Sequence, residues 1–162
     1  RSGPMNNLLY SVEREYPATI ERVWKAWTKA SELEKWYHPT DLSVVPNSAV
    51  SDLEIGGSWK IAIAVPQFEF VAYFFGWYSQ IQLHTKLAHS LSYTQEETEF
   101  AAADQDAPSH LIEVDFEARG SGCWVRFSQF GQMPADDAEA SRVGMESYFQ
   151  SLADYLEDAD RA

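Results

Sequence analysis

Two histidines in the sequence stand where an imidazole could bind a ligand or transfer a proton. His89 alternates with small residues in the run from Leu87 to Tyr93, so it shares the apolar face of a predicted strand. On that face it could orient a polar group of a ligand, or exchange a proton with it together with Tyr93. A histidine hydrogen-bonded inside the core is the other interpretation. His38 follows a tryptophan-rich segment and is placed either at the rim of a pocket or in a plain loop.

The remaining reactive side chains give weaker signals. His84 and His110 fall at the ends of predicted strands and are expected to be solvated. Cys123 is the only cysteine, so it cannot form an internal disulfide, and no activating partner stands near it in the sequence. The acidic residues from Glu113 to Glu117 share one face of a strand, which is typical of a solvated row. No Cys/His cluster has the spacing of a zinc site, and neither a metal nor a cofactor is predicted.

Aromatic residues make up 14% of the chain and form the candidate binding set. Each one is readily explained as a core residue, but together they exceed what a single covering helix needs. The surplus indicates an apolar cavity for a small hydrophobic or aromatic molecule. The predicted ligand-binding residues are Trp36, Trp59, Ile61, Tyr73, Phe75, Trp77, His89, Tyr93, Phe116, Gln129, Met145 and Phe149.

The predicted elements follow in the order strand, two short helices, about six strands and one long helix. Leu8–Tyr16 is typical of a strand, and Thr19 can cap a helix whose apolar residues recur at helical spacing. The run Ser31–Glu34 has the form of a capping box, which predicts a second short helix ending near Trp36. From about Asp137 to Asp158 an unbroken apolar stripe predicts the long helix.

One predicted strand, Phe70–Gln80, is apolar on both faces. Tyr73, Phe75 and Trp77 share one of these faces. Such a strand is expected to be covered on both sides, and a homodimer would provide one of the covers.

The chain after this strand contains a predicted loop and a predicted hairpin. The acidic, alanine-rich run Gln95–Ser109 is expected to be mobile. In the hairpin, a two-residue Ser121–Gly122 turn pairs Phe116 with Phe127 and makes their apolar rows coincide. The same register places Gln129 in the inner row, where it is a plausible polar contact for a ligand.

The order of elements predicts the fold class. A sheet needs its apolar face covered, and the long helix is the natural cover. We therefore expect an α+β fold in which a curved antiparallel sheet wraps around the C-terminal helix. Gly144 stands inside that helix, where glycine costs about 1 kcal/mol relative to alanine. This cost indicates a close approach of the sheet or of a ligand.

Length and charge bound the remaining possibilities. The 162 residues suit one core, and Arg1–Pro4 is interpreted as an expression scar, which leaves residues 5–162 as a single domain. The formal net charge is −13, and no stripe of Lys and Arg is present, so neither nucleic acid nor an anionic membrane is expected as a partner. No apolar run approaches the ~20 residues that span a bilayer, and a cytoplasmic location is expected.

Several segments together resemble a known family. They are Val23–Thr28, Glu32–Leu33, Trp36–Tyr37, Asp52–Trp59, Gly76–Tyr78, Gly122–Phe127 and Gly144–Met145 with the closing helix. Their order and spacing are similar to those of the Hsp90-ATPase-activator-homologue-like (AHSA1-like) domains of the SRPBCC superfamily, also called START-like or Bet v 1-like. Family members usually carry Trp after the helix glycine, where this chain has Met145.

The resemblance implies a helix-grip fold whose members commonly hold hydrophobic ligands between the sheet and the last helix. Binding of a small hydrophobic or aromatic molecule is therefore the leading hypothesis, favoured over catalysis. A cyclase- or hydrolase-like enzyme that uses the same pocket is an alternative, with His89 and Tyr93 handling the proton. A co-chaperone-like interaction protein that acts through its acidic surface is another.

Overall fold

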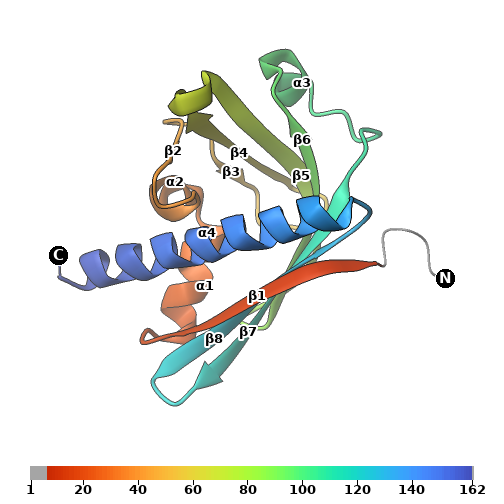
Figure 1. The fold of residues 1–162 in the computed structure, drawn as a ribbon. Coiled ribbons are helices and arrows are strands. Elements are labelled where there is room, and N and C mark those ends of the chain that lie inside the picture. The colour runs from red at the N-terminus through yellow and green to blue at the C-terminus, as the bar shows by residue number, and fades with distance from the viewer. Residues whose placement is uncertain (1–6, 162) are drawn as a thin grey trace.

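The computed structural model describes residues 7–161, so the segment Arg1–Pro4 lies outside the described range. The elements appear in the predicted order around one long helix (Figure 1). They are β1 (Leu8–Tyr16), α1 (Ile20–Thr28), α2 (Ala30–Trp36), β2 (Ser43–Val44), β3 (Val50–Ser51), β4 (Ser58–Val65), the 3-10 helix η2 (Pro66–Phe68), β5 (Phe70–Gln82), β6 (Lys86–Thr94), α3 (Glu97–Ala102), β7 (His110–Arg119), β8 (Gly122–Phe130) and α4 (Ala135–Arg161).

A single antiparallel sheet forms the body of the fold. Its strands follow the order β1-β8-β7-β6-β5-β4-β2, and β3 pairs with β4 beside this path. The sheet curls so that α4 lies across its concave face, with α1 and α2 closing one side (Figure 1). This arrangement confirms the predicted α+β class, in which a curved antiparallel sheet grips the C-terminal helix.

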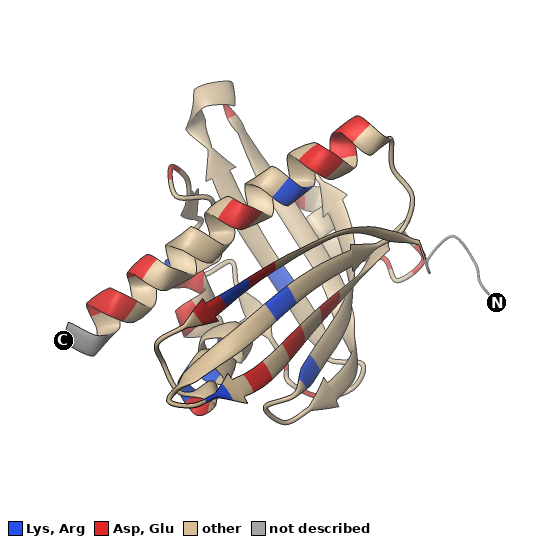
Figure 2. Ribbon diagram, turned by 60° about the horizontal axis from the view of Figure 1, so that its bottom comes forward, with Lys and Arg blue, Asp and Glu red and all other residues tan. Residues whose placement is uncertain are grey.

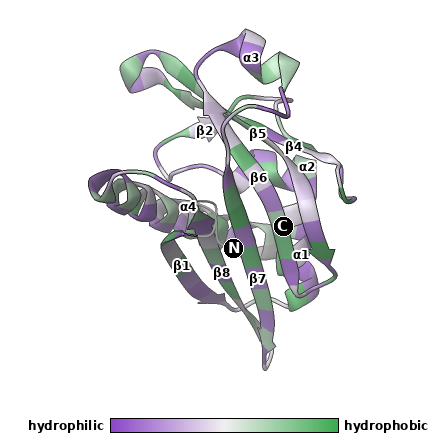
Figure 3. Cartoon of the chain, turned by 90° about the vertical axis from the view of Figure 1, so that its right-hand side faces the viewer, coloured by the Kyte–Doolittle hydropathy of each residue, from purple (hydrophilic) through white to green (hydrophobic). Residues whose placement is uncertain are grey.

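Alternation along the strands decides which side chains face α4. Hydrophobic and hydrophilic residues alternate along β6, β7 and β8 (Figure 3). In the β7–β8 hairpin, Val114 lies opposite Phe127 and Ile112 lies opposite Gln129, so both pairs face inward. The predicted faces are confirmed, but the predicted register is wrong by two residues.

The turn chemistry explains the corrected register. The structure pairs Arg119 with Gly122, so the two turn residues are Gly120 and Ser121 rather than Ser121 and Gly122. Gly120 has a φ of 61°, the left-handed conformation that glycine adopts without a steric cost. An even shift preserves the inner and outer rows, which is why the faces were nonetheless predicted correctly.

The helices between β1 and β2 bring a tryptophan cluster into the core. Thr19 caps α1 as predicted, because its side chain accepts a hydrogen bond from the Arg22 backbone N–H at 3.2 Å. Trp27 of α1 lies edge-on to Trp36 of α2, with ring centroids 4.7 Å apart. Among the residues described, the Trp27 Nε1 atom is the one fully enclosed side-chain nitrogen or oxygen without a hydrogen-bond partner.

Two local predictions are wrong. The capping box at Ser31–Glu34 does not form, because α2 begins at Ala30 and the Glu34 carboxylate instead accepts from the backbone N–H groups of Asn47 and Ala49. The run Gln95–Ser109 contains helix α3, so it is not simply a loop.

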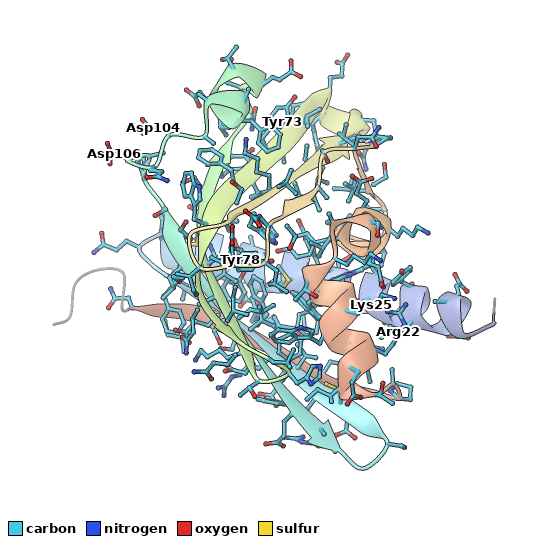
Figure 4. All side chains as sticks on the ribbon, turned by 180° about the vertical axis from the view of Figure 1, so that it is seen from behind. Arg22, Lys25, Tyr73, Tyr78, Asp104 and Asp106 are labelled. Atoms are coloured by element: carbon cyan, nitrogen blue, oxygen red, sulfur yellow. The ribbon has the colours of Figure 1, made fainter. Side chains whose placement is uncertain are left out.

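Charged side chains link α1, α2 and α4, and others lie on the outer surface. The Arg22 guanidinium lies 2.7 Å from the Glu32 carboxylate, which also accepts from the Tyr155 hydroxyl at 3.0 Å, so α1, α2 and α4 meet there. In Figure 4, Arg22 and Lys25 project from α1 towards this junction. Acidic residues recur along α4, whereas on the strands acidic residues alternate with Lys and Arg (Figure 2). Within the described range, no helix is both long enough and apolar enough to cross a membrane.

Candidate functional site

A cavity of about 700 Å³ opens between the first half of α4 and the concave face of the sheet. Strands β1, β5, β6, β7 and β8 contribute its floor, and the turns before β7 and before α4 form its rim. Its lining residues are Tyr10, Tyr37, Phe74, Leu91, Tyr93, Pro108, Ser109, His110, Phe127, Gln129, Gly131, Gln132, Met133, Ser141, Gly144, Met145 and Tyr148. Volumes of about 300–1,000 Å³ are typical of small-molecule sites.

The helix side of the cavity is left open by a glycine. A Cβ atom added to Gly144 would meet no heavy atom within 4 Å. The predicted close approach of the sheet is therefore wrong, and this position instead adds free space to the cavity. Met145, the next residue, is 7% exposed and fills the wall with a flexible side chain.

A chain of hydrogen bonds forms one polar end of the cavity. The Tyr10 hydroxyl donates to Gln129 Oε1 at 2.6 Å, and Gln129 Nε2 lies 2.7 Å from His110 Nδ1. On its other side, His110 Nε2 lies 3.3 Å from the backbone carbonyl oxygen of Gln132. Gly131 allows the imidazole to sit here, because a Cβ at that position would clash with the ring.

Two further tyrosines face the same space from the helical layer. The rings of Tyr37 and Tyr148 meet edge-on with centroids 5.0 Å apart. Among residues 7–161, neither hydroxyl has a hydrogen-bond partner. Burial raises the pKa of both phenols well above the ordinary value, and neighbouring tyrosines raise each further, Tyr148 and Tyr10 for Tyr37 and Tyr10 for Tyr148.

The second half of α4 anchors the helix to the rest of the fold. The Tyr16 hydroxyl donates to the Phe149 carbonyl at 2.9 Å, and the Ser151 hydroxyl donates to the His38 carbonyl at 2.7 Å. Between Ala135 and Glu146, no described residue of α4 forms a hydrogen bond or an ion pair with another strand or helix. The half of the helix that covers the cavity is thus held by apolar contact alone.

The structure brings three of the twelve predicted binding residues into the cavity wall. They are Tyr93, Gln129 and Met145. Tyr93 lies at the mouth, where 52% of it is exposed and its hydroxyl accepts from the Gln95 side chain at 2.7 Å. Gln129 lies at the polar end described above.

Five of the other predicted residues face inward but are packed into the solid part of the core. The α1 tryptophans occupy this part: Trp24 lies 5.1 Å from Phe116, and Trp27 lies 6.0 Å from Phe149, centroid to centroid. Side chains therefore fill the space that the sequence pattern assigned to a ligand. The five are Trp36, Trp59, Ile61, Phe116 and Phe149, each 5% exposed or less.

Tyr73, Phe75 and Trp77 lie on the convex face of the sheet, away from the cavity. Their neighbour Phe74 points inward, and successive side chains of a strand alternate between faces. Helix α3 covers part of this outer face, with the Phe100 ring 4.8 Å from the Tyr73 ring. Figure 4 shows Tyr73 beside α3. The predicted second cover of β5 is thus provided, at least at Tyr73, by the same chain.

His89 is a core residue rather than a cavity residue. Its ring stacks on Trp59 with centroids 4.2 Å apart, and its Nδ1–H donates to the Ser90 carbonyl at 2.8 Å. Burial lowers the pKa of His89 to about 4, so the imidazole is neutral near pH 7. The interpretation as a hydrogen-bonded core histidine is the one that this geometry supports.

Sequence reasoning missed several residues of the wall. His110 was expected to be solvated, but it lines the cavity and is hydrogen-bonded to Gln129. Its place opposite Leu91 in the β6–β7 ladder puts it on the inner face, and only the register reveals this. Tyr148 belongs to the apolar stripe of α4 and could have been found there.

His38 lies outside the wall, with Nδ1 2.6 Å from the Pro39 carbonyl. In the described range, no three His, Cys, Asp or Glu side chains are placed to bind a metal.

A curved sheet that grips a long helix over an apolar cavity defines a helix-grip domain. The family model "Activator of Hsp90 ATPase homolog 1-like protein" (AHSA1) matches residues 17–157, and the chain belongs to this family. Comparison with curated proteins gives no match.

Solved structures share the fold at low sequence identity. A protein from Arthrobacter aurescens superimposes with a TM-score of 0.78 at 15% identity, covering 98% of this chain and 90% of its own. The AHSA1 protein from Silicibacter pomeroyi gives a TM-score of 0.76 at 13% identity, covering 91% and 96%. DynU16, a protein of the dynemicin biosynthetic locus, gives 0.68 at 15% identity, covering 91% of this chain and 46% of its own. At these identities the likeness concerns the fold alone.

Proposed function

We propose that this domain binds a small hydrophobic or aromatic molecule in the cavity beneath the first half of α4. The observation that carries the proposal is the cavity itself, which has about 700 Å³ of space bounded mainly by aromatic and aliphatic side chains. A few convergent polar groups at one end, namely Tyr10, Gln129 and His110, are what a site needs to orient a bound molecule.

The arrangement supports binding rather than acid–base catalysis. His89, the histidine first considered for proton transfer, is stacked on Trp59 and lies outside the cavity wall. His110 does line the cavity, but both of its ring nitrogens are engaged, one by Gln129 and the other by the Gln132 carbonyl. An imidazole held at both nitrogens is poorly placed to exchange a proton with a ligand.

The helix glycine offers a direct test. Gly144→Phe would place an aromatic ring in the free space of the cavity, whereas Val143→Phe, one residue earlier, would place the same ring on a side chain position that is 54% exposed. We expect Gly144→Phe to abolish the fluorescence gain of Nile red, a neutral apolar dye, and Val143→Phe to retain it. Equal binding by the two variants would contradict the proposal.

The natural occupant can be sought in parallel. Native mass spectrometry of protein purified from its own host, before and after denaturation, should reveal a small molecule that is lost on unfolding. The Gly144→Phe variant, expressed and purified in the same way, should carry none, which ties the adduct to the cavity.

A further inference from the structure

The hydrogen-bond chain at the polar end of the cavity has a fixed direction. A backbone carbonyl can only accept, so the His110 Nε2 atom near the Gln132 oxygen carries a hydrogen. The amide nitrogen of Gln129 can only donate, so the facing His110 Nδ1 atom is bare and the imidazole is neutral in this arrangement. With the hydrogen of the neutral imidazole on Nε2, reversing the Gln129 amide would turn its oxygen towards the bare Nδ1 atom, so that two acceptors would face each other.

This direction extends to the wall of the cavity through Tyr10. Because Gln129 Nε2 is turned to His110, Gln129 Oε1 is turned to Tyr10 and accepts its hydroxyl hydrogen at 2.6 Å. The hydrogen of Tyr10 is therefore committed to the protein, and the oxygen presents only a lone pair to a ligand. Burial raises the pKa of Tyr10 far above the ordinary value, which keeps the phenol protonated.

The rest of the wall offers no charge to a ligand. None of the lining residues is Asp, Glu, Lys or Arg, although the chain as a whole carries a net charge of −13. The hydroxyls of Tyr37 and Tyr148 are unpartnered within residues 7–161 and are free to donate. A charged ligand would lose its hydration without gaining a counter-charge, which is costly in an apolar cavity.

We propose that the cavity selects uncharged molecules that carry a hydroxyl group, a phenol or an alcohol on an apolar skeleton, and that this hydroxyl donates to the oxygen of Tyr10. The inference rests on the proposed function and names the chemical class of the ligand. A second oxygen on the same molecule would accept from Tyr37 or Tyr148. A carboxylate at the same place faces the Tyr10 lone pair and is repelled, while an ether gives Tyr10 no hydrogen to accept.

Three fluorescent probes with one skeleton test this selection. They are 1-hydroxypyrene, 1-methoxypyrene and pyrene-1-carboxylate, titrated into the intact protein at neutral pH. We expect 1-hydroxypyrene to bind roughly tenfold more tightly than 1-methoxypyrene, because a single buried hydrogen bond separates them. Pyrene-1-carboxylate should bind more weakly than either.

Two tyrosine variants locate the selectivity. Tyr10→Phe removes the acceptor and should bring the affinity ratio of the hydroxy and methoxy probes close to one. Tyr73→Phe removes a hydroxyl on the convex face of the sheet, outside the cavity wall, and should leave the ratio unchanged. If Tyr10→Phe folds poorly, Gln129→Met serves instead, because it releases the Tyr10 hydrogen to donate into the cavity and should raise the affinity for 1-methoxypyrene.

The outcomes separate this inference from the proposed function. If 1-methoxypyrene or pyrene-1-carboxylate binds as tightly as 1-hydroxypyrene, or if Tyr10→Phe and Tyr73→Phe behave alike, the hydroxyl selectivity is wrong while binding in the cavity stands. If none of the three probes binds and Gly144→Phe does not alter Nile red fluorescence, both ideas fall.

Discussion

His89 should make the stability of this domain depend on pH in a way that one variant can isolate. The imidazole is 4% exposed, stacked on Trp59, and its pKa is lowered from 6.5 to about 4 because burial disfavours the charged form. In the unfolded chain the same group regains its ordinary pKa. The unfolded state therefore takes up a proton from this group before the folded state does as the pH falls.

The sign and size of the effect follow from linkage. The contribution of His89 to the free energy of unfolding is fully present above pH 6.5 and is lost as the pH falls towards 4. The whole shift corresponds to about 3 kcal/mol, and about 2 kcal/mol of it should be gone by about pH 5. That is a large fraction of the 5–15 kcal/mol that typically stabilises a domain of this kind.

The assay is urea unfolding followed by tryptophan fluorescence at about pH 7.5 and about pH 5. His89→Phe keeps a flat ring on Trp59 and removes the titrating group. We expect the wild-type protein to lose about 2 kcal/mol more than this variant between the two pH values. His84→Gln, which removes an imidazole from the turn between β5 and β6, should keep the wild-type loss. An equal loss in wild type and His89→Phe would refute the reasoning.

Three further predictions concern the cavity and its surroundings. Gly144→Ala should raise the free energy of unfolding by about 1 kcal/mol, measured with urea, because alanine favours the helix and its Cβ meets nothing within 4 Å; a destabilised variant would mean that the space is already filled. Gly131→Ala should displace the His110 ring and break its contact with Gln129, which should lower the free energy of unfolding by roughly 1–3 kcal/mol. The His110 NMR signals should shift, and an unchanged spectrum would contradict the packing of Gly131 against this ring. Phe100→Ala should remove the cover of Tyr73 and speed proteolysis within residues 95–109, with Phe68→Ala, on a side chain that is 77% exposed, as a neutral control.

The sequence was a good guide to the elements and to most of the inward-facing rows. Alternation along β6 and β8 placed Tyr93 and Gln129 on the inner face, where they line the cavity. The apolar stripe of α4 gave the covering helix and its Met145 contact. These features were predictable because one face of each element is apolar and the other polar, which is a local signal.

The remaining errors arise where the local signal is ambiguous. Strand β5 is apolar on both faces, so nothing in its own sequence shows that Phe74, rather than Tyr73 or Phe75, faces the cavity. Trp24 fills the end of the concave face near Phe116. This depends on how α1 packs on the sheet, which is a property of the tertiary structure. Tyr37 follows a short helix and has no periodic neighbours to reveal its direction. Sequence patterns thus predicted that a cavity exists but not which end of the concave face remains open.

The two halves of α4 are anchored unevenly, so we expect them to open at different rates. From Ser147 onward the helix is tied by hydrogen bonds to β1 at Tyr16, to α2 at Glu32, and to the loop after α2 at His38 and Thr40. The half over the cavity lacks such ties within the described chain, and segments held by apolar contact alone open at a lower cost in free energy. Amide hydrogens should therefore exchange faster before Glu146 than after it. Under the binding function proposed above, motion of this half-helix would affect how fast a molecule enters and leaves, whereas the side chains beneath it would set the affinity, so residence time and selectivity could change independently.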